Sequence, residues 1–174
     1  TFKKGKDVYI RIVDYNTGTK TFSPDDIEKG LNLQMLLYLF ALERSGAEAV
    51  GESARAAGVQ YFPARVPLMT ADGRLTDEEA ENLRRSEWKR KGLLLEDEDV
   101  LQAMDPDGEM SRLCCTRRKD GTLSGDIASR EQLRLLETYV FGILGDMVDN
   151  IASGDVTPNP YTRGTSHNAC TYCP

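Results

Sequence analysis

The residues with the clearest capacity for chemistry lie between positions 14 and 38. Asp14 ends an apolar, β-branched run, and a strand-end carboxylate beside the main-chain carbonyl of Tyr15 offers the oxygen ligands that a hard cation such as Mg²⁺ prefers. Such a cation lowers the pKa of a bound water molecule and offsets charge that develops on a phosphate. Gln34 and Tyr38 are four residues apart, so on a helix they would share one face and could reach one site.

Two strands and a helix have to position these side chains. Residues 7–16 are β-branched and aromatic and predict a strand. The residues that alternation places on one of its faces are Val8, Ile10, Ile12, Asp14 and Asn16. A helix is expected from the Ser23-Pro24 cap to about Arg44, and because it is apolar nearly all round it should be buried against a sheet. Residues 58–66 predict a second strand.

The composition divides the chain into three parts. Residues 1–66 form the expected core, and the polar residues 67–128 are expected to form a surface insertion. That insertion should hold a helix opened by the Thr76 capping box and packed down by Trp88, followed by a hairpin over 110–125. Residues 129–174 should supply a helix that ends near Gly154 and then a cysteine-bearing tail of the same domain.

Two motifs in order carry a resemblance to a known family. Ile12-Val-Asp-Tyr-Asn-Thr-Gly18 and Gly30-Leu-Asn-Leu-Gln-Met-Leu-Leu-Tyr38 resemble the PD-(D/E)XK nucleases of the RecB type, in which a strand-end Asp-Tyr-Lys-x-Gly precedes a helix with Gln-x-x-x-Tyr. Taken singly, a strand-end aspartate also suits a turn cap, and a helical glutamine or tyrosine also suits a satisfied core group. The ordered series favours the family.

The resemblance implies a fold, a reaction and roles for residues. The fold would be α/β, a restriction-endonuclease-like mixed sheet flanked by helices, and the reaction would be DNA cleavage with Mg²⁺ or Mn²⁺. Asp14 would bind the metal ion together with the main-chain carbonyl of Tyr15. Gln34 and Tyr38 would orient metal-bound water or the DNA backbone.

Asn16 is the main departure from this family. The family has a lysine there, which points into the site and stabilises charge on the phosphate, a role that a neutral amide fills poorly. Lys20 has the same parity and could substitute if the strand continued, but Gly18 intervenes. The family's first acidic ligand, in a Gly-x-x-Asp-Arg-x-Asp stretch, is also missing. We therefore expect a fold that is incomplete at its N-terminus and inactive alone.

The cysteines fall in two pairs. Cys170 and Cys173 form a Cys-x-x-Cys that by itself suits a zinc knuckle or plain thiols, and thiolates also suit iron-sulfur clusters. The Pro-Asn-Pro-Tyr161 stretch before it resembles the C-terminus of AddB-type subunits, which implies two of the four ligands of a [4Fe-4S] cluster. Cys114 and Cys115 are expected to be one buried and one exposed thiol on a strand. His167 is expected to be a solvated loop residue.

Composition limits the remaining possibilities. The 174 residues carry a net charge of −6, which argues against free-standing nucleic-acid binding, because phosphate neutralisation needs clustered cations. No apolar run is long enough to cross a membrane, so a cytoplasmic protein is expected. We predict the metal-dependent exonuclease domain of a bacterial helicase-nuclease in double-strand break repair, with DNA and an AddA-type subunit as partners. The alternative is a non-catalytic structural or DNA-guiding module with a degenerate site.

Overall fold

The protein is built on a five-stranded mixed sheet. The structure is a computed structural model that describes residues 1–18, 20–51, 53–64, 73–105, 110, 112–163 and 167–168. The strand order is β1-β2-β3-β4-β7, in which β2 pairs in parallel with β3, β4 pairs in parallel with β7, and the other two pairings are antiparallel. The strands are β1 Phe2–Lys4, β2 Asp7–Asn16, β3 Ser53–Pro63, β4 Lys91–Leu95 and β7 Ile127–Ala128.

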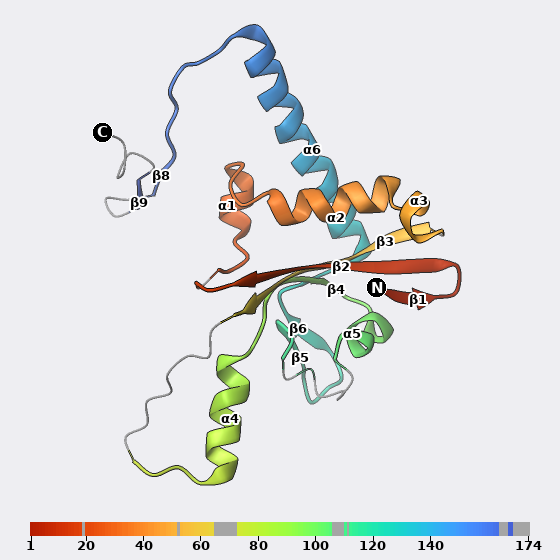
Figure 1. Cartoon of the computed structure of the whole chain (residues 1–174), viewed down its shortest axis with the longest axis vertical. Coiled ribbons are helices and arrows are strands. Elements are labelled where there is room, and N and C mark those ends of the chain that lie inside the picture. Colours follow the sequence, from red (N-terminus) through yellow and green to blue (C-terminus); the bar gives the residue numbers. More distant parts are fainter. Residues whose placement is uncertain are drawn as a thin grey trace.

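Helices cover the sheet from both sides. Figure 1 shows α1 (Pro24–Glu28), α2 (Gln34–Ser45) and α6 (Arg130–Ser153) on one side, with α5 (Glu98–Met104) and the β5–β6 hairpin on the other. The main core joins buried residues of α2, such as Phe40, to Val59 of β3. This architecture agrees with the α/β, restriction-endonuclease-like fold that the sequence predicted. The remaining elements are α3 Ala47–Val50, α4 Asp77–Glu87, β5 Cys115–Arg117, β6 Leu123–Gly125, β8 Thr162–Arg163 and β9 His167–Asn168.

Local signals in the sequence placed several element ends correctly. β2 spans Asp7–Asn16 as predicted. The Ser23 side chain accepts a hydrogen bond from the Asp26 N–H at the start of α1, and Thr76 and Ser129 both form complete capping boxes. The predicted hairpin is the β5–β6 pair, and α6 ends at Gly154 in the left-handed conformation.

The single helix expected from Ser23 to Arg44 is instead two helices. α1 closes with Gly30 at φ +73°, where the Gly30 N–H bonds to the Ile27 carbonyl and the Leu31 N–H bonds to the Asp26 carbonyl. That pattern is the Schellman motif, which ends a helix and fits glycine because no Cβ opposes the positive φ. The prediction was wrong because Gly30 was taken as interior to the helix. Gln34 therefore begins a helix of its own.

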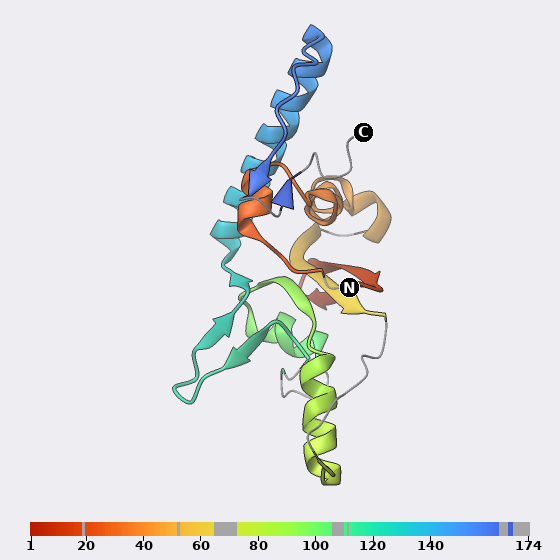
Figure 2. The ribbon, with the colours of Figure 1, turned by 90° about the vertical axis from the view of Figure 1, so that its left-hand side faces the viewer.

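The expected surface insertion over 67–128 supplies part of the core. β4 lies beside β3, and β7 pairs with β4, so this segment completes the sheet. A second buried cluster joins Leu94 of β4, Leu101 of α5 and residues of the hairpin. α4 does fit the expectation of a surface element, because it has no buried residue and projects away from the sheet (Figure 2). Trp88, the C-cap residue of α4, is 43% exposed.

The second predicted strand was placed too late in the chain. β3 begins at Ser53, five residues before the expected start at Gly58, and ends at Pro63, while residues 65 and 66 lie outside the described part of the chain. Gly58 was taken as a boundary but is an interior position with φ +128°. It sits against β4, where an added Cβ would lie 2.3 Å from the Leu93 carbonyl oxygen. Gly92 makes the reciprocal approach, since a Cβ added there would lie 2.0 Å from the Val59 carbonyl oxygen.

The β3–β4 contact should make Gly92 intolerant of any side chain. Gly92→Ala is expected to lower the free energy of unfolding by about 2 kcal/mol or more, because it combines a strained positive φ with overlap against backbone. Urea unfolding followed by circular dichroism measures the change. The matched control is Gly142→Ala in α6, where nothing lies within 4 Å, and this variant should gain about 0.5–1 kcal/mol. Equal stability of the two variants would contradict the close approach.

Candidate functional site

Asp14 lies near the end of β2 in a row of polar side chains across three strands. The register pairs Asp14 with Tyr61 of β3, and Tyr61 in turn with Lys91 of β4. Paired residues on neighbouring strands share a face, so the carboxylate, the phenol and the ammonium group lie on the same side of the sheet. Burial raises the pKa of Tyr61, and the nearby negative charge of Asp14 raises it further, so the phenol stays neutral.

Lys20 approaches Asp14 from the loop that follows β2. Its Nζ lies 3.5 Å from the Asp14 Oδ2 and 5.9 Å from the centre of the Tyr61 ring. The Asp14 side chain is 34% exposed, so the pair is open to solvent and screened by it. Lys20 was expected to replace the family lysine only if the strand continued to it. It contacts Asp14 in the structure even though Gly18 interrupts the strand.

Asn16 is occupied by the turn that brings Lys20 back. Its Oδ1 accepts a hydrogen bond of 2.7 Å from the Gly18 N–H, and its main-chain oxygen accepts one of 2.8 Å from the Ala64 N–H. A side-chain oxygen that bonds two residues ahead forms an Asx turn, which a lysine could not make. Asparagine at this position therefore has a local structural role, and the positive charge is supplied four residues later.

Gln34 and Tyr38 form a hydrogen-bonded pair on the exposed side of α2. The Gln34 Nε2 donates to the Tyr38 hydroxyl oxygen at 3.0 Å, as the four-residue spacing predicted for one helical face. Tyr38 is 52% exposed, so the pair faces solvent rather than the core. Within the part of the chain that the structure describes, no hydrogen bond or ion pair connects these two side chains to Asp14. Their shared pocket with Asp14 stays a prediction.

A hollow of about 350 Å³ opens beside this row and is lined by cations. It contains Asn16, Lys20 and Tyr61 from the first part of the chain, and Lys89 and Lys91 from the approach to β4. Glu87 is the one acid among its described lining residues. The sequence analysis missed Tyr61, Lys89 and Lys91. Alternation along 58–63 could have placed Tyr61 beside Asp14, but Lys89 and Lys91 lay in a segment taken as an insertion.

The donor set at this site fits a hard cation in part. Asp14 supplies a solvent-accessible carboxylate, and hard cations take oxygen ligands of this kind. Among the described residues, however, no three His, Cys, Asp or Glu side chains gather closely enough to form a metal site. Cys170 and Cys173 lie outside the residues that the structure describes.

Cys114 and Cys115 are both buried, which corrects the expectation of one buried and one exposed thiol. Cys114 precedes β5 and is not part of a regular strand, so alternation does not apply to the pair. Burial raises the pKa of the Cys114 thiol to about 12, helped by the neighbouring Cys115 and Asp126, and burial also raises the pKa of Cys115. Both thiols therefore stay protonated and fit the second core cluster.

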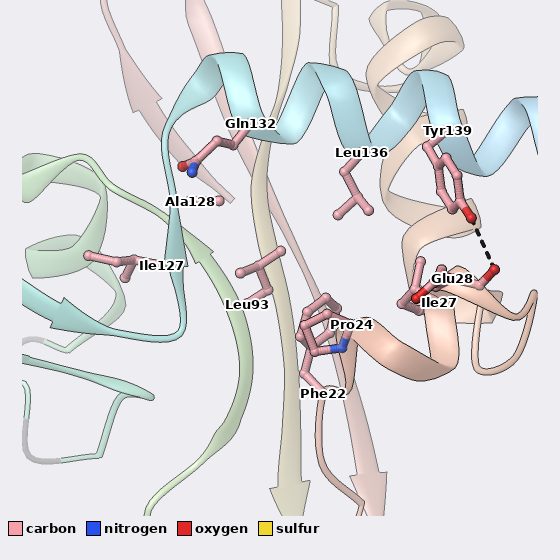
Figure 3. A pocket seen from close by; sticks show the side chains of 10 residues that line it. All are labelled: Phe22, Pro24, Ile27, Glu28, Leu93, Ile127, Ala128, Gln132, Leu136 and Tyr139. Atoms are coloured by element: carbon pink, nitrogen blue, oxygen red, sulfur yellow. Dashed lines mark hydrogen bonds between the residues drawn. The ribbon is translucent and has the colours of Figure 1, made fainter. Parts of the chain in front are cut away.

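A separate hollow, which is largely apolar, lies on the side of the sheet that α1 and α6 cover. Figure 3 shows Leu93 of β4 and Leu136 and Tyr139 of α6 converging there. Its volume is about 460 Å³, and the Tyr139 hydroxyl at its rim donates to the Glu28 carbonyl at 3.0 Å. Its described lining residues offer no cluster of titratable groups, so this hollow is a packing feature between α1, α6 and the sheet.

None of the described helices is both long enough and apolar enough to cross a lipid bilayer. α6, which has 24 residues, carries charged residues such as Arg134 and Asp146 among its apolar ones.

The family follows from the fold and from comparison with known proteins. Residues 3–174 match the PD-(D/E)XK nuclease superfamily, and the chain belongs to that superfamily. The match spans nearly the whole chain and agrees with the mixed sheet flanked by helices. The resemblance that Asp14, Gln34 and Tyr38 suggested is thereby confirmed at the level of the family.

Its relatives are subunits of helicase-nucleases. The chain is 34% identical over 177 residues to an ATP-dependent helicase/deoxyribonuclease subunit of the B type from Thermoanaerobacter sp. (strain X514), covering 99% of this chain and 15% of that protein. It is 38% identical over 170 residues to the subunit of the same name from Acetivibrio thermocellus, covering 95% and 15%. The chain thus spans about 15% of the length of the curated relatives it matches, and is a nuclease domain homologous to one part of these subunits.

The buried cysteines should be unreactive in the folded protein. In a Cys170→Ser/Cys173→Ser variant, we expect Cys114 and Cys115 to react only very slowly with a disulfide reagent such as DTNB at pH 8, because burial raises the pKa of both thiols. With a pKa of about 12, the Cys114 thiol is roughly one part in ten thousand thiolate at that pH. Absorbance of the released thiolate measures the rate. Denaturant should release both thiols, whereas rapid reaction of one thiol in the native protein would contradict the burial of both.

Proposed function

We propose that this chain is a DNA-cleaving exonuclease domain of an AddAB-type helicase-nuclease, acting on a strand that the helicase delivers during double-strand break repair. The observation that carries the proposal is the Lys20–Asp14 contact of 3.5 Å, which brings a cation to the strand-end carboxylate although Asn16 replaces the family lysine. The names of the relatives, which include both helicase and deoxyribonuclease, support the wider context.

The side chains of the chain suggest a division of labour in phosphodiester hydrolysis. Water attacks the phosphorus in line and gives up one proton to solvent. The bond from phosphorus to the leaving sugar oxygen breaks, and that oxygen takes up one proton from solvent. The Lys20 ammonium group stabilises negative charge that develops on the phosphate oxygens. The Tyr38 hydroxyl accepts from Gln34, which leaves its own proton free to donate to a phosphate oxygen or to the attacking water.

Asp14 supports a metal site as one of its ligands. Its carboxylate, with the main-chain carbonyl of Tyr15, would hold a divalent cation such as Mg²⁺ or Mn²⁺, and such a cation supplies an activated water and neutralises charge on the phosphate. The resemblance to the family implies a further acidic ligand from its Gly-x-x-Asp-Arg-x-Asp stretch.

A second candidate function is a non-catalytic DNA-guiding or structural module. Asn16 favours it, because its side chain serves the turn at Gly18 and offers no charge. In this case the fold would be retained for assembly and for cluster binding, and Lys20 would only neutralise Asp14.

Nuclease assays on the full-length subunit in complex with its helicase partner separate the two candidates. Asp14→Ala is expected to abolish cleavage, and Lys20→Met to slow it by about 100-fold, the typical cost of removing one group that stabilises transition-state charge. Asn16→Lys should give little gain, since Lys20 already supplies the charge. Arg134→Met on α6, an exposed cation in a local ion pair, is the control. Unchanged cleavage in Asp14→Ala, together with activity created by Asn16→Lys, would establish the non-catalytic module.

We further propose that Cys170 and Cys173 are two of the four thiolate ligands of a [4Fe-4S] cluster in the full-length protein. The Cys-x-x-Cys spacing and the Pro-Asn-Pro-Tyr161 context support this assignment, and thiolates are the ligands that such clusters take. The remaining two ligands come from elsewhere in the full-length protein.

The cluster proposal predicts a spectroscopic difference. The full-length protein purified without oxygen should show the broad visible absorbance of an iron-sulfur cluster and carry about four iron atoms. Cys173→Ser should remove both signals, whereas Cys114→Ser, at a buried thiol, should keep them. Zinc in place of iron, in stoichiometric amount, would refute the iron-sulfur assignment.

A further inference from the structure

The face of β2 and β3 opposite to Asp14 carries a cluster of arginines around one aromatic ring. The Arg90 guanidinium lies 4.1 Å from the centre of the Phe62 ring, and the Arg11 guanidinium lies 5.8 Å from it. Strand alternation explains the location, because Arg11 has the opposite parity to Asp14. Cation–π contact with the ring stabilises each guanidinium only modestly.

The positive charge of this cluster is poorly compensated. Within the described parts of the chain, neither Arg11 nor Arg90 forms an ion pair, and Arg11 donates to the neutral Gln60 Oε1 at 2.7 Å. Burial and the charge of Arg90 lower the pKa of Arg11. Burial likewise lowers the pKa of Arg90, with Arg112 adding to the effect and the carboxylate of Asp105 opposing it. Unpaired, partly desolvated guanidinium groups are costly unless an anion joins them.

Two buried donors in the same cluster lack acceptors among the described residues. The Gln60 side chain is fully buried, and its Nε2 has no hydrogen-bond partner there, as is also the case for the Nη1 of Arg90. Buried donors are nearly always satisfied in folded proteins. The buried Asp105 Oδ2 also lacks a partner among the described residues, and its negative charge offsets part of the charge of Arg90. Arg11 has no acidic partner of this kind among the described residues, so the cluster keeps a net positive charge.

An exposed aromatic side chain extends the cluster toward solvent. Tyr15 is 71% exposed and meets Phe62 edge to face, with ring centres 5.3 Å apart. Exposed aromatic rings beside arginines are the components of surfaces that stack unpaired bases and contact the phosphates between them. Most of the Tyr15 ring faces solvent, so its face is open to a stacking partner.

The cluster is continuous with the lysine-lined hollow. Phe62 and the flanking Lys89 and Lys91 line that hollow, while Arg90, between the two lysines, stacks on Phe62. Cations therefore run from Lys20 beside Asp14, around the ends of β2 and β3, to Arg11 on the other face. This run contrasts with the net charge of −6 that the chain carries as a whole.

From this arrangement we propose that Arg11, Arg90, Phe62 and Tyr15 bind a segment of single-stranded DNA next to the catalytic strand end. The arginines contact phosphate oxygens, and an unpaired base stacks on Tyr15. The assignment of DNA as ligand rests on the proposed function, but the anion-binding chemistry stands on the cluster itself. A duplex would leave the aromatic rings without a base to stack on, so a single strand fits better.

A binding experiment in EDTA tests the proposal without cleavage. A fluorescein-labelled oligothymidylate of about 15 nucleotides is titrated with the 174-residue chain, and fluorescence anisotropy reports the bound fraction. Arg11→Gln combined with Arg90→Gln should weaken binding by about 10-fold or more and lower the slope of the log Kd against log salt plot by about 1–2. Tyr15→Ala should weaken binding by about 5-fold or more with the slope unchanged, since stacking releases no counterion.

The controls keep the result interpretable. Arg134→Gln, which removes one positive charge on α6, should bind like the unmodified chain, and far-ultraviolet circular dichroism checks the fold of each variant. Tyr15→Ala removes a side chain that is largely in solvent, so it tests the surface even if the double arginine variant unfolds. Unchanged affinity in both variants would overturn this DNA surface whether or not the complex cleaves DNA. The proposal would also be overturned if these variants bound oligothymidylate normally and lost only their binding to the helicase partner.

Discussion

The parallel pairing of β2 with β3 is the constraint on which the rest of the structure depends. Ten residues of β2, from Asp7 to Asn16, pair with β3 in parallel, which requires the chain to cross over the sheet between the two strands. That crossover is made of α1, α2 and α3, so α2 with Gln34 and Tyr38 is held on the sheet by its own connection. The register also fixes Tyr61 beside Asp14, and β4 then adds Lys91 to the same row.

Charge at the strand end follows from this pairing and from one turn. Asn16 closes a turn through the Gly18 N–H, and the chain returns with Lys20 against Asp14. A positive charge thus lies beside Asp14 although Asn16 stands where the family has a lysine.

The two faces of the strand pair have different chemistry. On the side that α2 covers, the row through Asp14, Tyr61 and Lys91 borders an apolar core. The opposite side carries Arg11, Arg90 and the fully buried Gln60. β4 and the residues before it join the two, since Lys89 and Lys91 line the hollow while Arg90 stacks on Phe62. A negative net charge over the whole chain therefore conceals a local positive band, and bulk charge is a poor guide to what this domain contacts.

The sequence by itself determined the features that act over three or four residues. Caps, turns and side-chain alternation are local, so they predicted the strand at 7–16, the caps at Ser23, Thr76 and Ser129, and a shared helical face for Gln34 and Tyr38. They also predicted a hairpin within 110–125, where the paired strands are Cys115–Arg117 and Leu123–Gly125. Asp14 was identified by its family motif. Gly30 was a missed local signal, since a Schellman glycine ends a helix that hydrophobicity alone would continue.

Tertiary structure decided what depends on contacts between distant segments. Leu93–Leu95 is too short and apolar a run to reveal a strand, and only pairing with β3 across close-packed glycines makes β4 part of the sheet. Three further features depend on the same assembly. They are the burial of both Cys114 and Cys115, the approach of Lys20 to Asp14, and the convergence of Arg11 and Arg90 on Phe62. The physical reason is that each of these contacts joins residues whose separation in sequence carries no periodic or capping signal.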